Sequence, residues 1–271
     1  MAKLLNTLQL ESYEQDGLVF SIEVLTAEEA GKYLLIANDL ERQMGGRPQP
    51  TELSMLNLHF RWAYDLVCHP KVLDAVEDVL GPDLIAWASG LFPKHPHDPG
   101  FISWHQDGTY WNLDSMQLVT AWIALSNSTV ENGCMRGVPG SHQLQYQPHK
   151  DTYAEDNQLS RGQEIEVDVD EADAVDIVLR AGEMSLHHIK LIHGSNANTS
   201  DEQRMGFAIR YVTPQVEQVG HRPQGVLARG QDNFGNFDLI DEPKTMDMQA
   251  SIEAMRHTVE MHLKSVMPRS S

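Results

Sequence analysis

The chain has 271 residues, 41% of them hydrophobic, which is enough for one large domain or two small ones with a buried core. Its 39 acidic and 20 basic residues give a net charge of −19. Nucleic acids and anionic membranes are bound through basic surfaces, so this charge argues against both as partners and leaves a small molecule as the expected one. Nothing in the composition predicts an oligomeric state.

The sequence has the features of a cytoplasmic protein. No window approaches the roughly 18 apolar residues of a membrane span. The first residues lack the apolar core of a signal peptide. The two cysteines, Cys68 and Cys134, could form a disulfide but are expected to be reduced. We therefore expect a cytoplasmic location.

Helical signals dominate the first third of the chain, after a strand-like run over residues 18–25. Thr26 is followed three residues later by Glu29, which is the pattern of a capping box and predicts a helix start. The segment 45–50 is rich in Gly and Pro and is expected to be a loop. Two further helices are predicted over residues 56–67 and 70–80.

From about residue 84 the pattern changes to short apolar or alternating runs between clusters of Gly, Pro, Asn and Asp. Strands are bounded in this way, and many short strands without intervening helices predict a barrel or a double-sheet jelly roll. The expected strands cover residues 84–92, 118–125, 164–169, 176–179, 183–188 and 204–212.

The last part of the chain is expected to contain long loops over residues 214–248 and an amphipathic helix over 247–266. We therefore predict a mainly β protein with helical decoration and a single domain over residues 1–271. Its parts are a largely helical segment (1–83), a jelly-roll core (84–213) and a segment of loops with a C-terminal helix (214–271).

The stretch Trp104–Gly108 carries the main chemical signal. His105 and Asp107 are two residues apart, so on a strand both would face the same cavity. A second strand candidate ends at His193, beside a Gly-Ser turn. Two histidines and one carboxylate form the facial triad of non-haem Fe(II) oxygenases, which leaves the opposite face of the metal open. Arg204 begins the next apolar run and suits a dicarboxylate, because guanidinium binds carboxylate in a bidentate manner.

The sequence resembles the phytanoyl-CoA dioxygenase family of Fe(II)- and 2-oxoglutarate-dependent oxygenases over about residues 12–212. The resemblance implies a double-stranded β-helix core, which is a cupin-like jelly roll. It also implies that Fe(II), 2-oxoglutarate and O₂ are used. The motifs that carry it are Tyr13–Gly17 followed by Leu25–Glu29, Trp104–Gly108 with Tyr110 and Trp111, Asn132–Gly133 with Pro139–His142, and His193–Ser195 with Arg204.

The resemblance also implies roles for individual residues. Iron would be bound by His105, Asp107 and His193, and the distal carboxylate of 2-oxoglutarate by Arg204 with Ser195 nearby. Halogenating relatives have a small residue in place of the aspartate, so the presence of Asp107 implies hydroxylation.

Other residues are weaker candidates. Lys94 and Gln106 are expected to approach the co-substrate, although Gln106 would face away from His105 on an ideal strand. The candidates for contact with the substrate or for a lid over it are Tyr110, Trp111, Arg136, Asn57, His59 and Arg210. His187 and His188 cannot both enter one cavity and are expected to be structural, and His95 and His97 to be solvated loop residues.

The sequence says little about the substrate. A CoA thioester is disfavoured because no Lys/Arg cluster is present to bind its phosphates. We predict hydroxylation of an aliphatic C–H of a small polar metabolite, and an organophosphonate such as 2-aminoethylphosphonate is the first choice. Hydroxylation of an ectoine-like, specialised-metabolite or acyl-CoA substrate is the alternative. Two other classes, an inactive ligand-binding jelly roll and a zinc hydrolase, stay open, because zinc also binds two histidines and one carboxylate.

Overall fold

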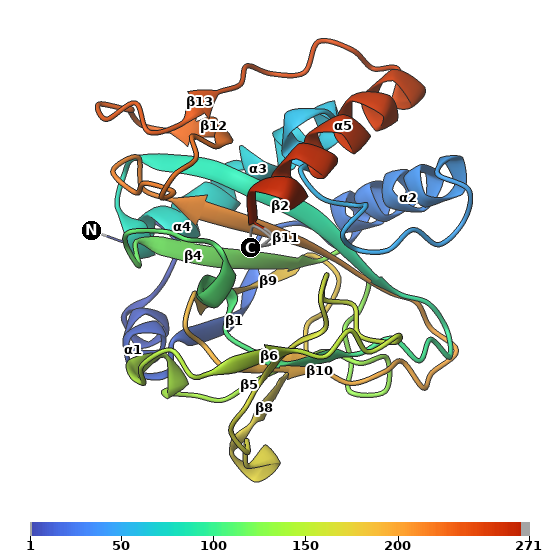
Figure 1. The fold of residues 1–271 in the computed structure, drawn as a ribbon, viewed down its shortest axis with the longest axis vertical. Coiled ribbons are helices and arrows are strands. Elements are labelled where there is room, and N and C mark those ends of the chain that lie inside the picture. Colours follow the sequence, from blue (N-terminus) through green and yellow to red (C-terminus); the bar gives the residue numbers. More distant parts are fainter. Residues whose placement is uncertain (1, 267–271) are drawn as a thin grey trace.

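The fold was analysed in a computed structural model that describes residues 2–266, except for the side chains of Tyr110 and residues 262–266 (Figure 1). No helix among the described residues is long and apolar enough to cross a bilayer. The helices are α1 (Thr7–Asp16), α2 (Ala27–Gln43), α3 (Arg61–Val67), α4 (Pro70–Leu80) and α5 (Met248–Val266).

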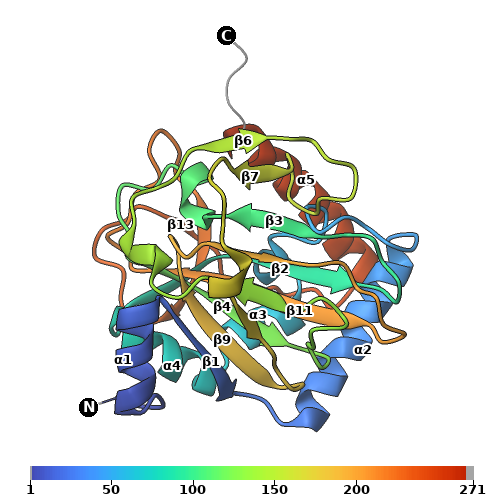
Figure 2. The same ribbon diagram turned by 90° about the horizontal axis from the view of Figure 1, so that it is seen from below.

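Two antiparallel sheets face each other and form the predicted jelly roll, while a smaller two-stranded sheet lies beside β3 (Figure 2). The larger sheet has the order β1 (Leu18–Glu23), β9 (Glu183–His188), β4 (Leu118–Ala124), β11 (Arg204–Val212), β2 (Leu84–Lys94), β12 (Gln224–Arg229) and β13 (Asp238–Leu239). The second has the order β3 (Ile102–His105), β10 (His193–Ser195), β5 (Met135–Gly137) and β8 (Val175–Ile177). The small sheet pairs β6 (His149–Asp151) with β7 (Gln163–Ile165).

Both faces of the larger sheet are buried, and side chains of β11 alternate between them. Phe207 and Ile209 belong to a core shared with α2, α3 and α5, which lie above this sheet in Figure 1. Ala208 belongs to a second apolar cluster between the two sheets, and Arg204 and Arg210 line cavities on the same inner side. This alternation places charged side chains of a central strand inside the jelly roll.

Most predicted elements are present. Thr26 caps α2, and its side chain and that of Glu29 bond reciprocally to the backbone. The single helix expected over 56–67 is wrong, because Phe60 is extended and separates a short 3-10 turn from α3. The helix α1 was not predicted, and the expected loop 214–248 contains β12, which pairs with β2.

Candidate metal centre

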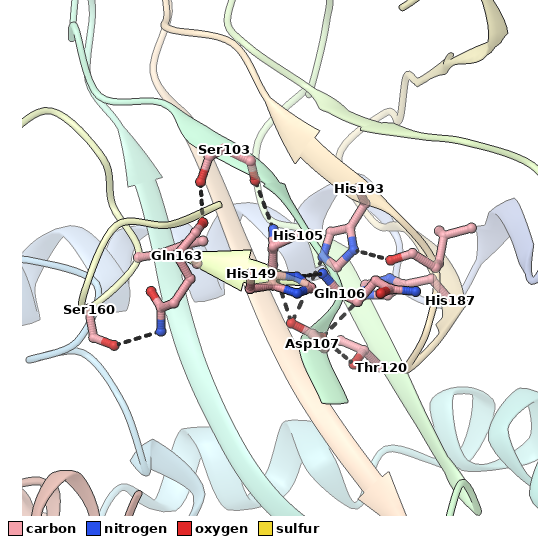
Figure 3. A network of polar contacts seen from close by, with 12 residues as sticks. Ser103, His105, Gln106, Asp107, Thr120, His149, Ser160, Gln163, His187 and His193 are labelled. Atoms are coloured by element: carbon pink, nitrogen blue, oxygen red, sulfur yellow. Dashed lines mark hydrogen bonds and ion pairs between the residues drawn. The ribbon is translucent and has the colours of Figure 1, made fainter. Parts of the chain in front are cut away.

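Three side chains predicted to bind a metal converge between the sheets (Figure 3). His105 ends β3, Asp107 begins the 3-10 turn that follows, and His193 begins β10. The strands β10 and β3 pair so that the Cα atoms of His193 and His105 are partners. The ligand atoms of the three residues all lie within 4.8 Å of one another, and all three side chains are buried.

The two histidines present the same ring nitrogen to this cluster. Nδ1 of His105 lies 2.9 Å from the carbonyl oxygen of Ser103, and Nδ1 of His193 lies 2.9 Å from that of Leu191. A carbonyl oxygen only accepts, so each Nδ1 carries a proton, and in the neutral imidazole each Nε2 then keeps its lone pair. These Nε2 atoms lie 3.4 and 4.0 Å from Oδ1 of Asp107. Lone pairs that face one another repel unless a cation lies between them, so this donor set fits a divalent metal ion.

The surroundings favour the deprotonated forms of these donors. Burial alone raises the pKa of Asp107, but polar contacts from the histidines around it and the charge of Arg210 hold that pKa well below its usual value. Burial lowers the pKa of His193 well below its usual value, and the neighbouring His105 adds to this effect. An ionised carboxylate and a neutral imidazole are the forms that bind metal.

Two buried cations, Arg204 and Lys94, lie side by side in the same interior. They are Cα partners across β11 and β2. Nζ of Lys94 donates to Oγ of Ser195 at 2.7 Å and to the carbonyl oxygen of Asn196, and Arg204 donates to the carbonyl oxygen of Gly133. Among the described residues, neither cation takes part in an ion pair with a carboxylate. A dianionic ligand would therefore find a guanidinium group and an amine whose protonated form it favours, and neither group is paired with a carboxylate.

The electrostatic cost of this pair is visible in its pKa values. Burial lowers the pKa of Lys94 to about 6, with the charge of Arg204 as the next cause. Burial also lowers the pKa of Arg204 to about 10. Arg204 and Ser195 line one cavity of about 510 Å³ together with the three residues of the metal cluster. One cavity thus contains the metal-binding donor set together with Arg204 and Ser195, and Lys94 donates to this serine.

The position of Arg204 depends on a close contact between Gly206 and Trp122. The ring of Trp122 lies 5.5 Å from Cζ of Arg204, which is the distance of a cation–π contact. A Cβ on Gly206 would lie 1.8 Å from this ring. Glycine is therefore required at 206 for the tryptophan to support the guanidinium group.

A second cavity, of about 1130 Å³, shares His105 and Asp107 with the first. Aromatic side chains form part of its wall, among them Trp111, as predicted. Cζ of Arg210 lies 5.7 Å from the ring of Trp111 and 5.4 Å from that of Phe92. Arg161 also lines this cavity and pairs with Asp151 at 3.3 Å. Arg161 was not predicted, because nothing in its local sequence separates it from an exposed loop residue.

The phytanoyl-CoA dioxygenase family profile matches residues 53–206, which is more than half of the chain and includes the whole metal cluster. The chain belongs to the phytanoyl-CoA dioxygenase family. This confirms the predicted family.

Among solved structures, the chain is similar to the non-haem monooxygenase ThoJ, with 33% identity, a TM-score of 0.81 and coverage of 95% of this chain and 98% of ThoJ. The 2-oxoglutarate-dependent carbocyclase SnoK from nogalamycin biosynthesis is 25% identical, with a TM-score of 0.66 and coverage of 80% of this chain and 87% of SnoK. These similarities confirm the jelly-roll fold.

Two curated relatives are similar over part of their length. A probable alpha-ketoglutarate-dependent hypophosphite dioxygenase from Stutzerimonas stutzeri is 27% identical over 68% of this chain and 61% of its own length. The peroxisomal phytanoyl-CoA dioxygenase of Bos taurus is 31% identical over 52% of this chain and 43% of its own. The chain thus spans about two fifths to three fifths of these curated relatives. Relatives of the family use iron and 2-oxoglutarate, as the resemblance implied.

Several candidates of the family site lie elsewhere than expected. Gln106 faces away from the metal cluster and bonds to the backbone of Lys190 and Gln147, so strand alternation overrides the family expectation. Arg136 pairs with Glu171 and Asp176 outside both cavities. The prediction of pocket roles for Gln106 and Arg136 is therefore wrong.

The proposed lid residues are also wrong. Asn57 is fully buried and bonds to Ser89 and to the carbonyl oxygen of Ala86. His59 bonds to Thr258 of α5 at 2.8 Å. Both residues tie the helical segment to its neighbours, and neither lines one of the two cavities. The side chain of Tyr110 lies outside the described part of the chain.

The remaining histidines differ in exposure, and the sequence did not predict which of them are buried. His97 is exposed, as expected, whereas His95 is mostly buried and lies 3.2 Å from the buried Glu41. His187 and His188 face opposite sides of β9, as predicted. However, His187 lines the first cavity, 3.8 Å from Oδ2 of Asp107. The expectation that His187 is structural gave no sign of this place beside the metal cluster.

Proposed function

We propose that the chain is an Fe(II)- and 2-oxoglutarate-dependent dioxygenase that hydroxylates an aliphatic C–H bond. In this proposal, His105, Asp107 and His193 hold Fe(II), which supplies the activation of O₂. The balanced reaction converts substrate C–H, 2-oxoglutarate and O₂ into the alcohol, succinate and CO₂. One observation carries the proposal: a buried donor set with two unprotonated Nε2 atoms shares a cavity with Arg204 and Ser195.

The residues of the first cavity, and Lys94 beside it, have separate tasks in this reaction. Arg204 and Lys94 would bind the distal carboxylate of 2-oxoglutarate, with the hydroxyl of Ser195 beside it. Trp122 and Met135 line the same cavity and keep its walls apolar, which limits the access of water to the reacting atoms. The arrangement favours an oxygenase over a zinc hydrolase, because hydrolysis has no need of a buried pair of cations. It also disfavours an inactive binding protein, since every member of the donor set is present.

For the substrate we propose a small anionic metabolite, with an organophosphonate such as 2-aminoethylphosphonate as the first candidate. Three cations are candidates for binding its anionic group. Arg136 is neutralised outside the cavities, and Lys94 lies beside Ser195, whereas Arg210 lines both cavities next to Asp107. Arg210 forms no ion pair with another described residue within 4 Å. The hypophosphite relative supports a phosphorus-containing substrate.

A larger specialised metabolite is the second candidate, and the lining of the second cavity favours it. This cavity is lined by Trp87, Phe92 and Trp111, and flat aromatic side chains suit a ring-containing substrate. SnoK, one of the structural relatives, belongs to nogalamycin biosynthesis. An acyl-CoA or an ectoine-like zwitterion has no comparable feature in its favour.

A screen for succinate release tests both levels of the proposal. The protein is incubated with Fe(II), 2-oxoglutarate and O₂ and with small phosphonates, ectoine-like zwitterions, acyl-CoAs or aromatic natural products. Substrate-dependent succinate together with a product heavier by one oxygen atom supports the reaction, and the productive class identifies the substrate. If 2-oxoglutarate fails to change the visible spectrum of the anaerobic Fe(II) protein, the oxygenase assignment fails and the hydrolase gains.

A further inference from the structure

A third imidazole, that of His187, enters the metal centre beside the two predicted ligands. His187 lies on β9, where its Cα is the partner of Thr120 on β4. Its side chain is 2% exposed and lines the first cavity, together with the metal cluster. The ring centroids of His187 and His193 are 4.7 Å apart, and Nε2 of His187 lies 3.8 Å from Oδ2 of Asp107 (Figure 3).

Neither ring nitrogen of His187 has a hydrogen-bond partner among the described residues. A buried polar group without a partner costs free energy, so an unpaired imidazole at this position calls for a reason. Its neighbour His188, on the opposite face of the same strand, accepts a hydrogen bond from the backbone N–H of Lys190. The strand therefore does not leave histidines unpaired in general.

The geometry argues against His187 as a fourth protein ligand. Among the described residues, the group whose ligand atoms all lie within 4.8 Å of one another consists of His105, Asp107 and His193. His187 lies instead on the side of the second carboxylate oxygen of Asp107. Oδ1 of this carboxylate faces His105 and His193, at 3.4 and 4.0 Å. Its Oδ2 faces Thr120, whose hydroxyl donates at 3.3 Å, and His187.

We propose that His187 is a positioning residue for Asp107. Its Nε2–H donates to Oδ2 of Asp107 when Oδ1 binds the metal, and the hydroxyl of Thr120 donates to the same oxygen. Oδ2 is then engaged by two donors, so the carboxylate binds through one oxygen and a coordination position stays open. Closing the contact from 3.8 Å to the usual 2.7–3.2 Å needs a shift of about 1 Å or less. This inference rests on the metal site of the proposed function.

The proposal explains why a histidine stands here rather than an apolar ring. A phenylalanine would fill the same space in the cavity wall but could not donate to the carboxylate. Partners of this kind fix the orientation of a metal ligand, and their loss typically weakens metal binding about 10- to 100-fold.

The test compares metal affinity in three variants of the whole chain. His187→Phe removes the donor and keeps the ring, and His187→Gln keeps an N–H at similar reach. His188→Phe is the matched control on the opposite face of the strand. The dissociation constant for Ni(II), which stays redox-inert during titration, is measured by calorimetry without 2-oxoglutarate. Thermal unfolding of the metal-free proteins is measured in parallel.

We expect His187→Phe to raise the dissociation constant for Ni(II) about 10- to 100-fold. The constants of His187→Gln and His188→Phe should stay within about threefold of the wild-type value. An unchanged constant in His187→Phe would overturn the proposal, and so would weaker 2-oxoglutarate binding with unchanged metal affinity, which would indicate a co-substrate contact instead. Should His187→Phe fail to fold, His187→Leu replaces it as the variant without a donor. If the wild type binds neither Ni(II) nor Fe(II), the proposed function itself fails.

Discussion

Arg204→Met separates the binding of 2-oxoglutarate from the stability of the fold. Methionine has a similar length and flexibility, so the substitution removes the charge while it largely preserves the volume. Arg204 is 2% exposed, its Nε has no hydrogen-bond partner, and it lies beside the second buried cation, Lys94. These features predict opposite effects on the two properties.

The size of the binding effect follows from the contact that is lost. Hydrogen bonds to a charged group contribute about 1.5–3 kcal/mol. Because about 1.4 kcal/mol corresponds to a factor of ten, the dissociation constant for 2-oxoglutarate should rise roughly 10- to 150-fold. The protein without ligand should keep its stability or gain some, since replacing a buried charge by an apolar side chain is often neutral or stabilising by about 1–4 kcal/mol.

Two measurements check this prediction. Calorimetric titration of 2-oxoglutarate into the Ni(II)-loaded protein gives the dissociation constant, and urea unfolding of the free protein gives the free energy of unfolding. Arg222→Met is the control, because Arg222 is exposed and pairs with Asp238 at the surface. A change in the constant of less than threefold, or a loss of stability above about 2 kcal/mol, would refute the role given to Arg204.

Four further predictions concern the same site. Asp107→Ala should abolish metal binding and hydroxylation, and metal titration with succinate release checks both. The pKa of Lys94 lies near 6 in the free protein, and a bound dianion favours its charged form. Binding therefore takes up a proton above pH 6, so the affinity for 2-oxoglutarate should fall by up to about tenfold per pH unit in this range. In Lys94→Met the affinity should no longer depend on pH in this range. Gly206→Ala should displace Trp122 and lower the free energy of unfolding by about 1–3 kcal/mol, measured in urea. Arg210→Met should raise the KM for an anionic substrate and leave the dissociation constant for 2-oxoglutarate unchanged.

Lys94 also affects stability, with a definite sign. Its pKa in the folded protein lies below the unfolded value of 10.5, so folding releases a proton between about pH 6 and 10.5. The contribution of Lys94 should therefore increase the free energy of unfolding of the free protein as the pH rises across this window.

The parts of the site that could be predicted were local in sequence or carried by a family motif. His105 and Asp107 were found because their spacing places them together. Arg204 was found because a lone basic residue begins an apolar strand. Lys94 was only a weak candidate, because its pairing with Arg204 depends on the register of β2 and β11, which the sequence does not state.

The errors have physical reasons of the same kind. Alternation predicted that His187 and His188 face opposite sides, but only the pairing of β9 with β4 decides which one faces the cavity. Asn57 was predicted to belong to a lid because its side chain is polar. In the structure its amide donates to the buried backbone carbonyl of Ala86 instead. The helix α1 has no buried residue, so it had no apolar face to recognise.

His193 and His105 are direct partners on neighbouring strands, so a metal ion bound by both would link β10 to β3. The two histidines lie far apart in the sequence, and a long segment of the chain closes into a loop when their strands meet. Closing a loop costs chain entropy, and this cost grows only slowly with the length of the loop. A metal ion bound by both histidines would hold the loop closed. The site does not exist before the strands pair. Metal binding would therefore add directly to the stability of the assembled four-stranded sheet that contains β3 and β10. Chelators should therefore loosen β3 and β10 first, and hydrogen exchange at their amides should reveal it.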